Sequence, residues 1–180
     1  MFYYSNPSYA IIYAVLAIVL LVLFPEPAYK GPENVTYFRG PNLKEEIDRD
    51  KRIVWVVQFF AGWSPLCRQV TPVFAQLSNE YALKNLRFAK MDISRYPKEA
   101  EKFRINIHPT SRQLPTVSLF QNGKEVKRRP TIDSNHRAVP YVFKKENIIF
   151  DFDLNTIYAE CKANLSKKDL ETVETQKKTN

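Results

Sequence analysis

The sequence has few cysteines and few histidines. Of its 180 residues only two are cysteine, Cys67 and Cys161, and only two are histidine, His108 and His136. Two cysteines are too few for a scaffold held together by disulfide bonds, and their scarcity favours a reducing compartment. Neither histidine stands near a carboxylate cluster or a third ligand at metal spacing. We therefore expect no metal and no other cofactor.

Charged side chains are absent from residues 1–25, although the whole chain has a formal net charge of +8. The basic excess therefore lies downstream, where it favours anionic partners such as a membrane surface. The sequence also lacks a zinc spacing of cysteine and histidine and a recognisable nucleic-acid motif. We expect no binding to nucleic acid.

The uncharged N-terminal segment contains an apolar run from Pro7 to Phe24, which predicts one transmembrane helix over residues 7–24. A helix of these 18 residues would span about 27 Å at about 1.5 Å per residue, close to a thin endoplasmic-reticulum bilayer. Interfacial aromatics flank the run, namely Tyr3, Tyr4, Tyr9 and Tyr29. The alternative is a cleaved signal peptide, although the run has no basic residue before it and no Ala-x-Ala cleavage site.

Basic side chains follow the apolar run but do not precede it, beginning with Lys30, Arg39 and Lys44. The positive-inside rule therefore places the C-terminal domain in the cytosol. The chain ends in Lys177-Lys178-Thr179-Asn180, which resembles the dilysine retrieval signal of endoplasmic-reticulum membrane proteins. The alternative is a disordered lysine-rich tail. The sequon at Asn164 could be glycosylated only if the domain were luminal.

Residues 35–165 are expected to form one domain, between a linker over 25–34 and a disordered tail over 166–180 that carries the dilysine-type signal. Apolar periodicity and turn residues predict strands at 35–38, 53–60, 86–93, 114–120 and 126–129, and helices at 42–47, 65–83, 97–103 and within 154–165. The order βαβαβ implies parallel strands joined by crossover helices, and the following ββα adds a hairpin around Asn122-Gly123.

Four features make residues 35–165 resemble the thioredoxin superfamily. They are Trp63 before a Ser64-x-x-Cys67 motif, Pro72 five residues after Cys67, Pro115-Thr116 at the position of a cis-proline turn, and Lys90 at the position of a buried lysine near the active site. The resemblance implies an α/β thioredoxin fold, a central mixed sheet flanked by helices, to which this chain adds its N-terminal helix.

Further matches are similar to an endoplasmic-reticulum membrane branch of the protein disulfide isomerase family. They include Arg49-Asp50-Lys51-Arg52, Gln113-Leu114-Pro115-Thr116 and Arg128-Arg129-Pro130. This resemblance implies a role in protein folding and redox balance at the endoplasmic reticulum and the mitochondria-associated membrane. The chain departs from this branch at Pro65-Leu66, two residues that make the motif stiffer and more apolar.

Two groups that the redox chemistry of the superfamily needs are changed. Ser64 replaces the nucleophilic cysteine, and a hydroxyl ionises too weakly to attack a disulfide. Gln58 occupies the position of a buried acid that relays protons, and an amide cannot take up a proton. We therefore expect dithiol-disulfide oxidoreductase activity to be absent or weak.

Cys67 has two interpretations. It is a possible single redox thiol that forms mixed disulfides or a disulfide-linked homodimer, or it is a covered apolar residue with an ordinary pKa. Cys161 shares an apolar helical face with Leu154 and Ile157, which favours a place in the core.

The resemblance also implies a groove at Pro115, where an extended segment of a client or partner protein pairs with the backbone. Its expected substrate-binding residues are Trp63, Leu66, Leu114 and Pro115, with Ser64 at the rim. The alternative is that these residues only cap the ends of strands.

Three functions stay open at this point. The first is a membrane-anchored regulator of redox state and protein folding, acting by partner binding and reversible chemistry of Cys67. The second is a monothiol oxidoreductase or isomerase acting on mixed disulfides. The third is a structural interaction module in the membrane.

Overall fold

The computed structural model describes residues 7–23 and 29–165. The described elements are α1 (Pro7–Leu23), β1 (Val35–Phe38), α2 (Asn42–Arg49), β2 (Val54–Phe60), α3 (Pro65–Tyr81), β3 (Leu86–Asp92), α4 (Pro97–Lys102), the 3-10 turn η2 (Pro109–Ser111), β4 (Thr116–Gln121), β5 (Lys124–Arg129), α5 (Lys145–Phe152) and α6 (Leu154–Ala163). The predicted tail over 166–180, with its dilysine signal, lies outside the described residues.

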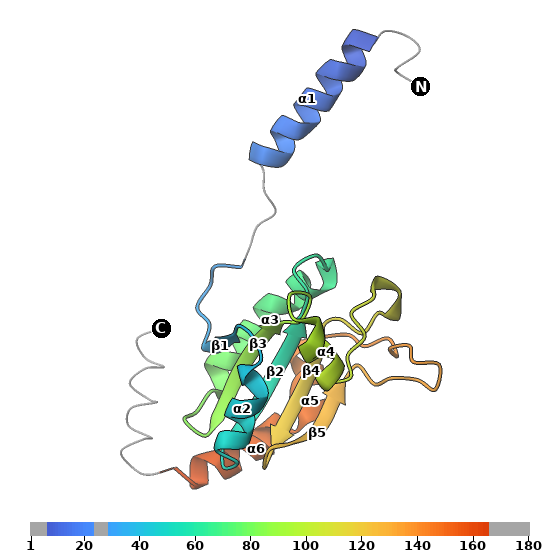
Figure 1. The fold of residues 1–180 in the computed structure, drawn as a ribbon. Coiled ribbons are helices and arrows are strands. Elements are labelled where there is room, and N and C mark those ends of the chain that lie inside the picture. Colours follow the sequence, from blue (N-terminus) through green and yellow to red (C-terminus); the bar gives the residue numbers. More distant parts are fainter. Residues whose placement is uncertain (1–6, 24–28, 166–180) are drawn as a thin grey trace.

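The strands form one mixed sheet in the order β1-β3-β2-β4-β5 (Figure 1). The strands β1, β3 and β2 are parallel, whereas β4 and β5 run antiparallel. The central strand β2 is a nearly continuous apolar run, because helices cover both of its faces. Asn122 and Gly123 turn the β4–β5 hairpin with positive φ at both residues, as a two-residue turn requires.

Successive residues of β2 belong to two different cores. Trp55, Val57 and Phe59 face the core that is closed by α2 and α4. Val56 faces the second core, which is closed by α3, α5 and α6. This alternation follows from strand geometry, in which neighbouring side chains point to opposite faces. The result confirms the predicted thioredoxin fold with a mixed sheet between helical layers.

The predicted elements are confirmed with bounds that differ by at most two residues, and one helix was not predicted. The hairpin strand β5 begins at Lys124 rather than at residue 126. The helix α5 was not predicted, because its eight residues carry only a weak apolar periodicity. It ends at Asp153, whose positive φ of 52° separates it from α6.

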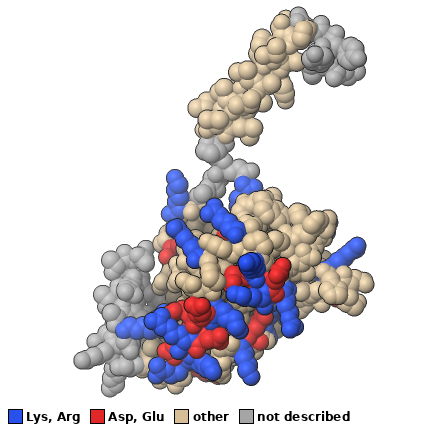
Figure 2. All heavy atoms as spheres, viewed as in Figure 1, with Lys and Arg blue, Asp and Glu red and all other residues tan. Residues whose placement is uncertain are grey.

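The expected transmembrane helix over 7–24 is not found as such. The helix α1 covers 17 residues, and residue 24 of the predicted span lies outside the described residues. Among the described residues, no helix combines the length and the apolar character needed to cross a membrane. Figure 2 shows α1 without basic or acidic atoms, whereas lysine, arginine and acidic side chains intermingle on the domain.

Candidate functional site

The site lies where β2 ends and α3 begins, at the carboxyl edge of the parallel strands. A tight turn joins the two elements, and the Ser64 N–H donates to the Ala61 carbonyl over 3.1 Å. Ser64 has extended backbone angles, as the residue before a proline prefers. Pro65 then opens α3, where its fixed φ suits the first helical turn. This turn fixes how the motif residues meet solvent.

Exposure alternates along the motif. Ser64 and Cys67 are buried, with 5% and 2% of their surface exposed. Trp63 and Leu66 are 49% and 53% exposed. A separation of three residues brings Ser64 and Cys67 to the inner side of the first helical turn. The surface of the motif is therefore apolar, and its polar and sulfur atoms lie beneath it.

Burial raises the pKa of the Cys67 thiol. The Asp92 carboxylate acts in the same direction, whereas hydrogen bonds with the Ala61 main chain and the Ser64 side chain oppose the increase. A raised pKa keeps the thiol protonated at neutral pH, and the protonated thiol is not the attacking species. Cys67 is unpaired in the structure, as is the buried Cys161 on α6. The helix N-terminus thus does not make Cys67 an activated thiolate.

Gln58 lies in the middle of β2, at the position where the resemblance implies a proton-relay acid. Its side chain is 1% exposed, and its Oε1 has no hydrogen-bond partner among the described residues. It stands opposite Lys90 in the pairing of β2 with β3. An amide at this position can accept a hydrogen bond but supplies no proton to Cys67.

A groove of about 350 Å³ lies beside the motif. Its lining consists of Trp63, Ser64, Pro65, Leu66, His108, Pro109, Arg112, Gln113 and Leu114. Three of the expected binding residues and Ser64 therefore share one hollow. Pro115 is buried just behind the lining. The Leu114–Pro115 peptide bond is cis, as the resemblance implies, and a second cis bond, Arg129–Pro130, was not predicted.

The backbone of Leu114 is free at the groove. Within the described residues, no hydrogen bond uses its N–H or C=O, although the neighbouring Gln113 carbonyl accepts from Thr116 Oγ1 over 2.6 Å. Unpaired main-chain groups beside a strand are the elements that pair with an added extended segment. The groove thus combines an apolar rim with a backbone edge.

The far wall of the groove is a loop that sequence reasoning missed. The Gln113 side chain braces it, since Oε1 accepts from the Asn106 N–H over 2.8 Å and Nε2 donates to the His136 carbonyl. The Ser111 hydroxyl also hydrogen-bonds the carbonyls of Asn106 and His108. The loop has no periodicity to mark it, and the only signal was its position just before Pro115.

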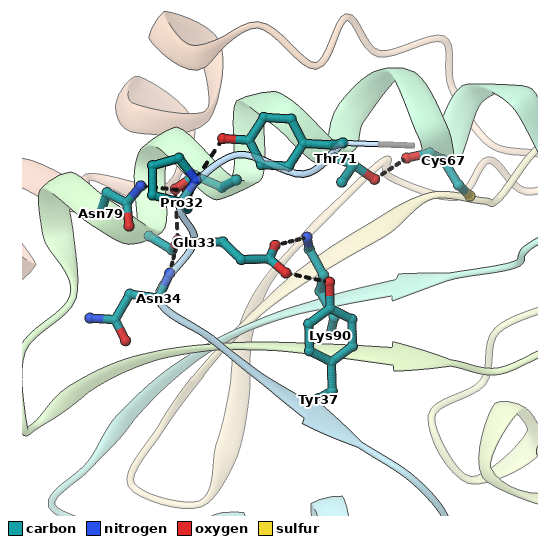
Figure 3. Close-up of polar contacts among 11 residues, drawn as sticks. Pro32, Glu33, Asn34, Tyr37, Cys67, Thr71, Asn79 and Lys90 are labelled. Atoms are coloured by element: carbon teal, nitrogen blue, oxygen red, sulfur yellow. Dashed lines mark hydrogen bonds and ion pairs between the residues drawn. The ribbon is translucent and has the colours of Figure 1, made fainter. Parts of the chain in front are cut away.

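Lys90, the expected buried lysine, is 2% exposed. Its Nζ lies 2.7 Å from Glu33 Oε2, and the Tyr37 hydroxyl donates to Glu33 Oε1 over 2.6 Å (Figure 3). Burial alone would raise the pKa of Glu33, but the hydrogen bonds and charge of Lys90, with the bond from Tyr37, lower it. The counterion of this buried lysine thus comes from the segment before β1.

Two neighbours of Glu33 also attach to α3. Asn79 Nδ2 donates to the Pro32 carbonyl over 2.7 Å, and the Asn34 N–H donates to Ser78 Oγ over 3.0 Å. We call residues 32–34 the strap. The strap lies in the stretch that was expected to be a linker, yet it is bound to the domain.

The described residues contain no group of three or more potential metal ligands. The site consists of a groove, a backbone edge and one buried thiol. Together with the fold, these features define a thioredoxin-fold protein whose first motif cysteine is serine.

Comparison with known proteins supports that class. The chain belongs to the thioredoxin family, whose profile matches residues 34–138. It is similar to the thioredoxin from Nicotiana alata, which shares the fold at 23% identity and a TM-score of 0.51, covering 69% of this chain and 98% of that one.

More particular relatives are thioredoxin-related transmembrane protein 2 homologs. The one from Caenorhabditis elegans is 52% identical over 152 residues, covering 84% of this chain and 57% of that protein. The one from Drosophila melanogaster is 44% identical over 158 residues, covering 87% of this chain and 58% of that protein. The chain spans somewhat more than half the length of these relatives.

Proposed function

We propose that this chain is a membrane-associated thioredoxin-like protein of the endoplasmic reticulum that binds extended segments of partner proteins at the groove. Through this binding it regulates protein folding and cellular redox state. The observation that carries the proposal is the exposed apolar rim of Trp63 and Leu66 above the covered Ser64 and Cys67. The surface of the site is thus arranged for contact, with its one sulfur withdrawn.

The binding mode follows from the backbone edge. A partner segment in extended conformation would pair its main chain with the free N–H and C=O of Leu114. Its side chain would then cover Trp63 and Leu66, whose exposed surface supplies the hydrophobic gain. Neither step needs a reactive sulfur, so the loss of the first cysteine leaves this function intact.

Reversible oxidation of Cys67 is secondary to partner binding in the proposed function. A mixed disulfide, or a disulfide-linked homodimer, requires the sulfur to meet a second sulfur at bonding distance. Cys67 is 2% exposed, so it must first leave its covered position. We therefore place reversible oxidation of Cys67 downstream of partner binding, and a monothiol oxidoreductase is the competing function.

Membrane association rests on two observations. The relatives carry the word transmembrane in their names, and the described part of the N-terminal segment is apolar and fully uncharged. Basic residues follow that segment, which favours a domain on the cytosolic side. The branch resemblance supports the endoplasmic reticulum and its contacts with mitochondria.

The proposal is tested with the full chain in neutral detergent micelles and an array of 15-residue peptides. We expect binding of extended apolar peptides, with affinity reduced at least about tenfold by Leu66→Asp, since a hot-spot side chain contributes about 2 kcal/mol or more. Val126→Asp is the matched control, because Val126 is equally exposed (53%) but lies on β5.

A reduction assay separates the competing enzyme. With insulin as substrate and a thiol donor, we expect no turnover above the donor alone. Turnover that disappears in Cys67→Ala would replace the binding function with a monothiol oxidoreductase. Equal peptide binding by the wild type, Leu66→Asp and Val126→Asp would remove the groove from the proposal.

A further inference from the structure

The two walls of the groove differ in chemistry. The wall formed by the start of α3 is apolar at Trp63, Pro65 and Leu66. The opposite wall, around η2, adds the cationic Arg112 and the imidazole of His108. None of the lining residues is acidic. An occupant therefore meets an apolar surface on one side and a positive charge without a counterion on the other.

Arg112 is available to a ligand. Its side chain is exposed, and it makes no hydrogen bond or ion pair with the described residues. By contrast, Arg128 pairs with Glu125 over 2.6 Å, and Arg129 pairs with Asp151 over 3.2 Å. A free guanidinium at the groove is suited to a carboxylate, which it can bind through two parallel hydrogen bonds.

His108 presents a donor on the same wall. The Thr110 N–H donates to His108 Nδ1 over 3.3 Å, and Thr110 Oγ1 lies 2.8 Å from the same atom. In the tautomer whose Nδ1 accepts from the Thr110 N–H, the proton of the neutral ring is on Nε2. No bond to a described residue occupies Nε2, so this nitrogen remains as a donor for an acceptor in the groove.

We infer that the groove selects extended polypeptide segments in which an apolar side chain is accompanied by a carboxylate. The apolar side chain contacts Trp63 and Leu66, and the carboxylate pairs with Arg112 and accepts from His108 Nε2. This inference rests on the proposed binding function and names its partner class. The positive net charge of the chain, +8, adds a longer-range attraction for acidic partners.

The opposite walls set the spacing. Successive side chains of an extended segment point to opposite sides. A side chain directed at Trp63 and Leu66 therefore leaves the next side chain directed at the wall of Arg112. The preferred segment carries its acid next to its apolar anchor.

The experiment compares three peptides of one sequence with the full chain in neutral detergent. Each has leucine at position i and differs only at i+1, which is glutamate, glutamine or lysine. We expect the glutamate peptide to bind about three- to tenfold more tightly than the glutamine peptide at low salt, as a partly exposed charge pair allows. The preference should shrink at 0.3 M salt, because the pair is screened.

Variants of the arginine decide the assignment. Arg112→Gln should remove the preference while leaving the glutamine peptide bound within about twofold, and Arg112→Glu should reverse it toward the lysine peptide. Arg39→Gln is the matched control, since it removes an equal charge from an exposed residue next to β1. The control should keep the preference.

The outcomes separate the two proposals. Equal binding of all three peptides, still lost in Leu66→Asp, would overturn the acidic preference and leave the binding function in place. No peptide binding at all would overturn both. Retention of the preference in Arg112→Gln would overturn the role of Arg112. Vesicles of phosphatidylserine form the second arm: Arg112-dependent binding to them, without any preference among the peptides, would overturn the peptide assignment in favour of a lipid headgroup.

Discussion

At the scale of single residues, Ser64 and Cys67 are both buried at the start of α3. The hydroxyl of Ser64 opposes the rise in the pKa of Cys67 that burial causes. The serine therefore acts on the sulfur as a hydrogen-bonding neighbour, although it cannot replace the lost cysteine as a nucleophile.

We expect slow alkylation of Cys67 as a result. In a Cys161→Ala background, iodoacetamide should modify the folded chain at pH 8 at least about tenfold more slowly than the unfolded chain, because thiolate character and access are both reduced. Ser64→Ala should slow the folded reaction further. A folded rate equal to the unfolded rate would contradict the covered position, as measured by intact-mass spectrometry.

Glu33 gives a second residue-scale prediction. Glu33→Gln should lower the free energy of unfolding by about 2–3 kcal/mol at pH 7, since it removes a charged partner from a buried ammonium. Lys90→Met should cost less, because Glu33 retains access to water with 23% of its side chain exposed. Urea unfolding of the two variants gives the comparison, and an equal or reversed order would contradict this account.

The same pair fixes a pH dependence. The pKa of Glu33 is lower in the folded chain than its ordinary value of 4.5, so the unfolded chain binds a proton more readily. The stabilisation by Glu33 is therefore complete above that value and is lost as the pH falls through the folded pKa. Urea unfolding from pH 7 to pH 3 should show the wild type approaching Glu33→Gln only below about 4.5.

At the scale of elements, Arg128 joins the hairpin strand β5 to the end of α4. Its guanidinium donates to the carbonyls of Phe103 and Arg104 and pairs with both oxygens of Glu125. Arg128→Ala should lower the free energy of unfolding by about 2 kcal/mol, because the part-buried Phe103 carbonyl loses a charged donor. Lys124→Ala, at an exposed position of the same strand, should change it by less than about 0.5 kcal/mol. Similar losses for both variants would show that Arg128 is not a structural link.

The elements also show how much of the fold the sequence predicts. A long apolar run predicted β2, since a strand covered on both faces leaves a nearly unbroken apolar pattern. The motif located the turn at Ser64, and the resemblance to the thioredoxin superfamily implied the cis bond before Pro115. The apolar periodicity predicted neither α5 nor the positions of Arg112 and His108 on the groove wall. Those two residues reach the site through the hydrogen bonds of an irregular loop, which leaves no period in the sequence.

At the scale of the whole molecule, the strap sets where the folded unit begins. A chain that starts at residue 29 keeps the ion pair between Glu33 and Lys90 and the hydrogen bond from Asn34 to Ser78. A chain that starts at residue 35 loses both contacts. We expect the shorter chain to be less stable by about 2–4 kcal/mol, measured by urea unfolding. Glu33→Gln in the longer chain should reproduce a large part of that loss. Equal stability of the two truncated chains would contradict a structural role for the strap.

The sequence predicted the layers of the whole molecule but not this boundary. Turn residues before β1 resembled a linker, because an isolated Glu33 gives no sign that its partner is Lys90, 57 residues away. Such long-range pairs depend on the three-dimensional arrangement of β1, β3 and α3.

The strap also gives the molecule a mechanical character. It lies between the apolar N-terminal segment and the first strand, so tension applied through that segment would reach Glu33 before it reached β1. The Asn79 hydrogen bond to the Pro32 carbonyl would carry the load first, and the ion pair between Glu33 and Lys90 would follow. Rupture of that ion pair would leave the ammonium of Lys90 between Tyr37 and Phe74 without its carboxylate. Tension on the N-terminal side would thus leave the buried Lys90 ammonium without its counterion before any strand separates.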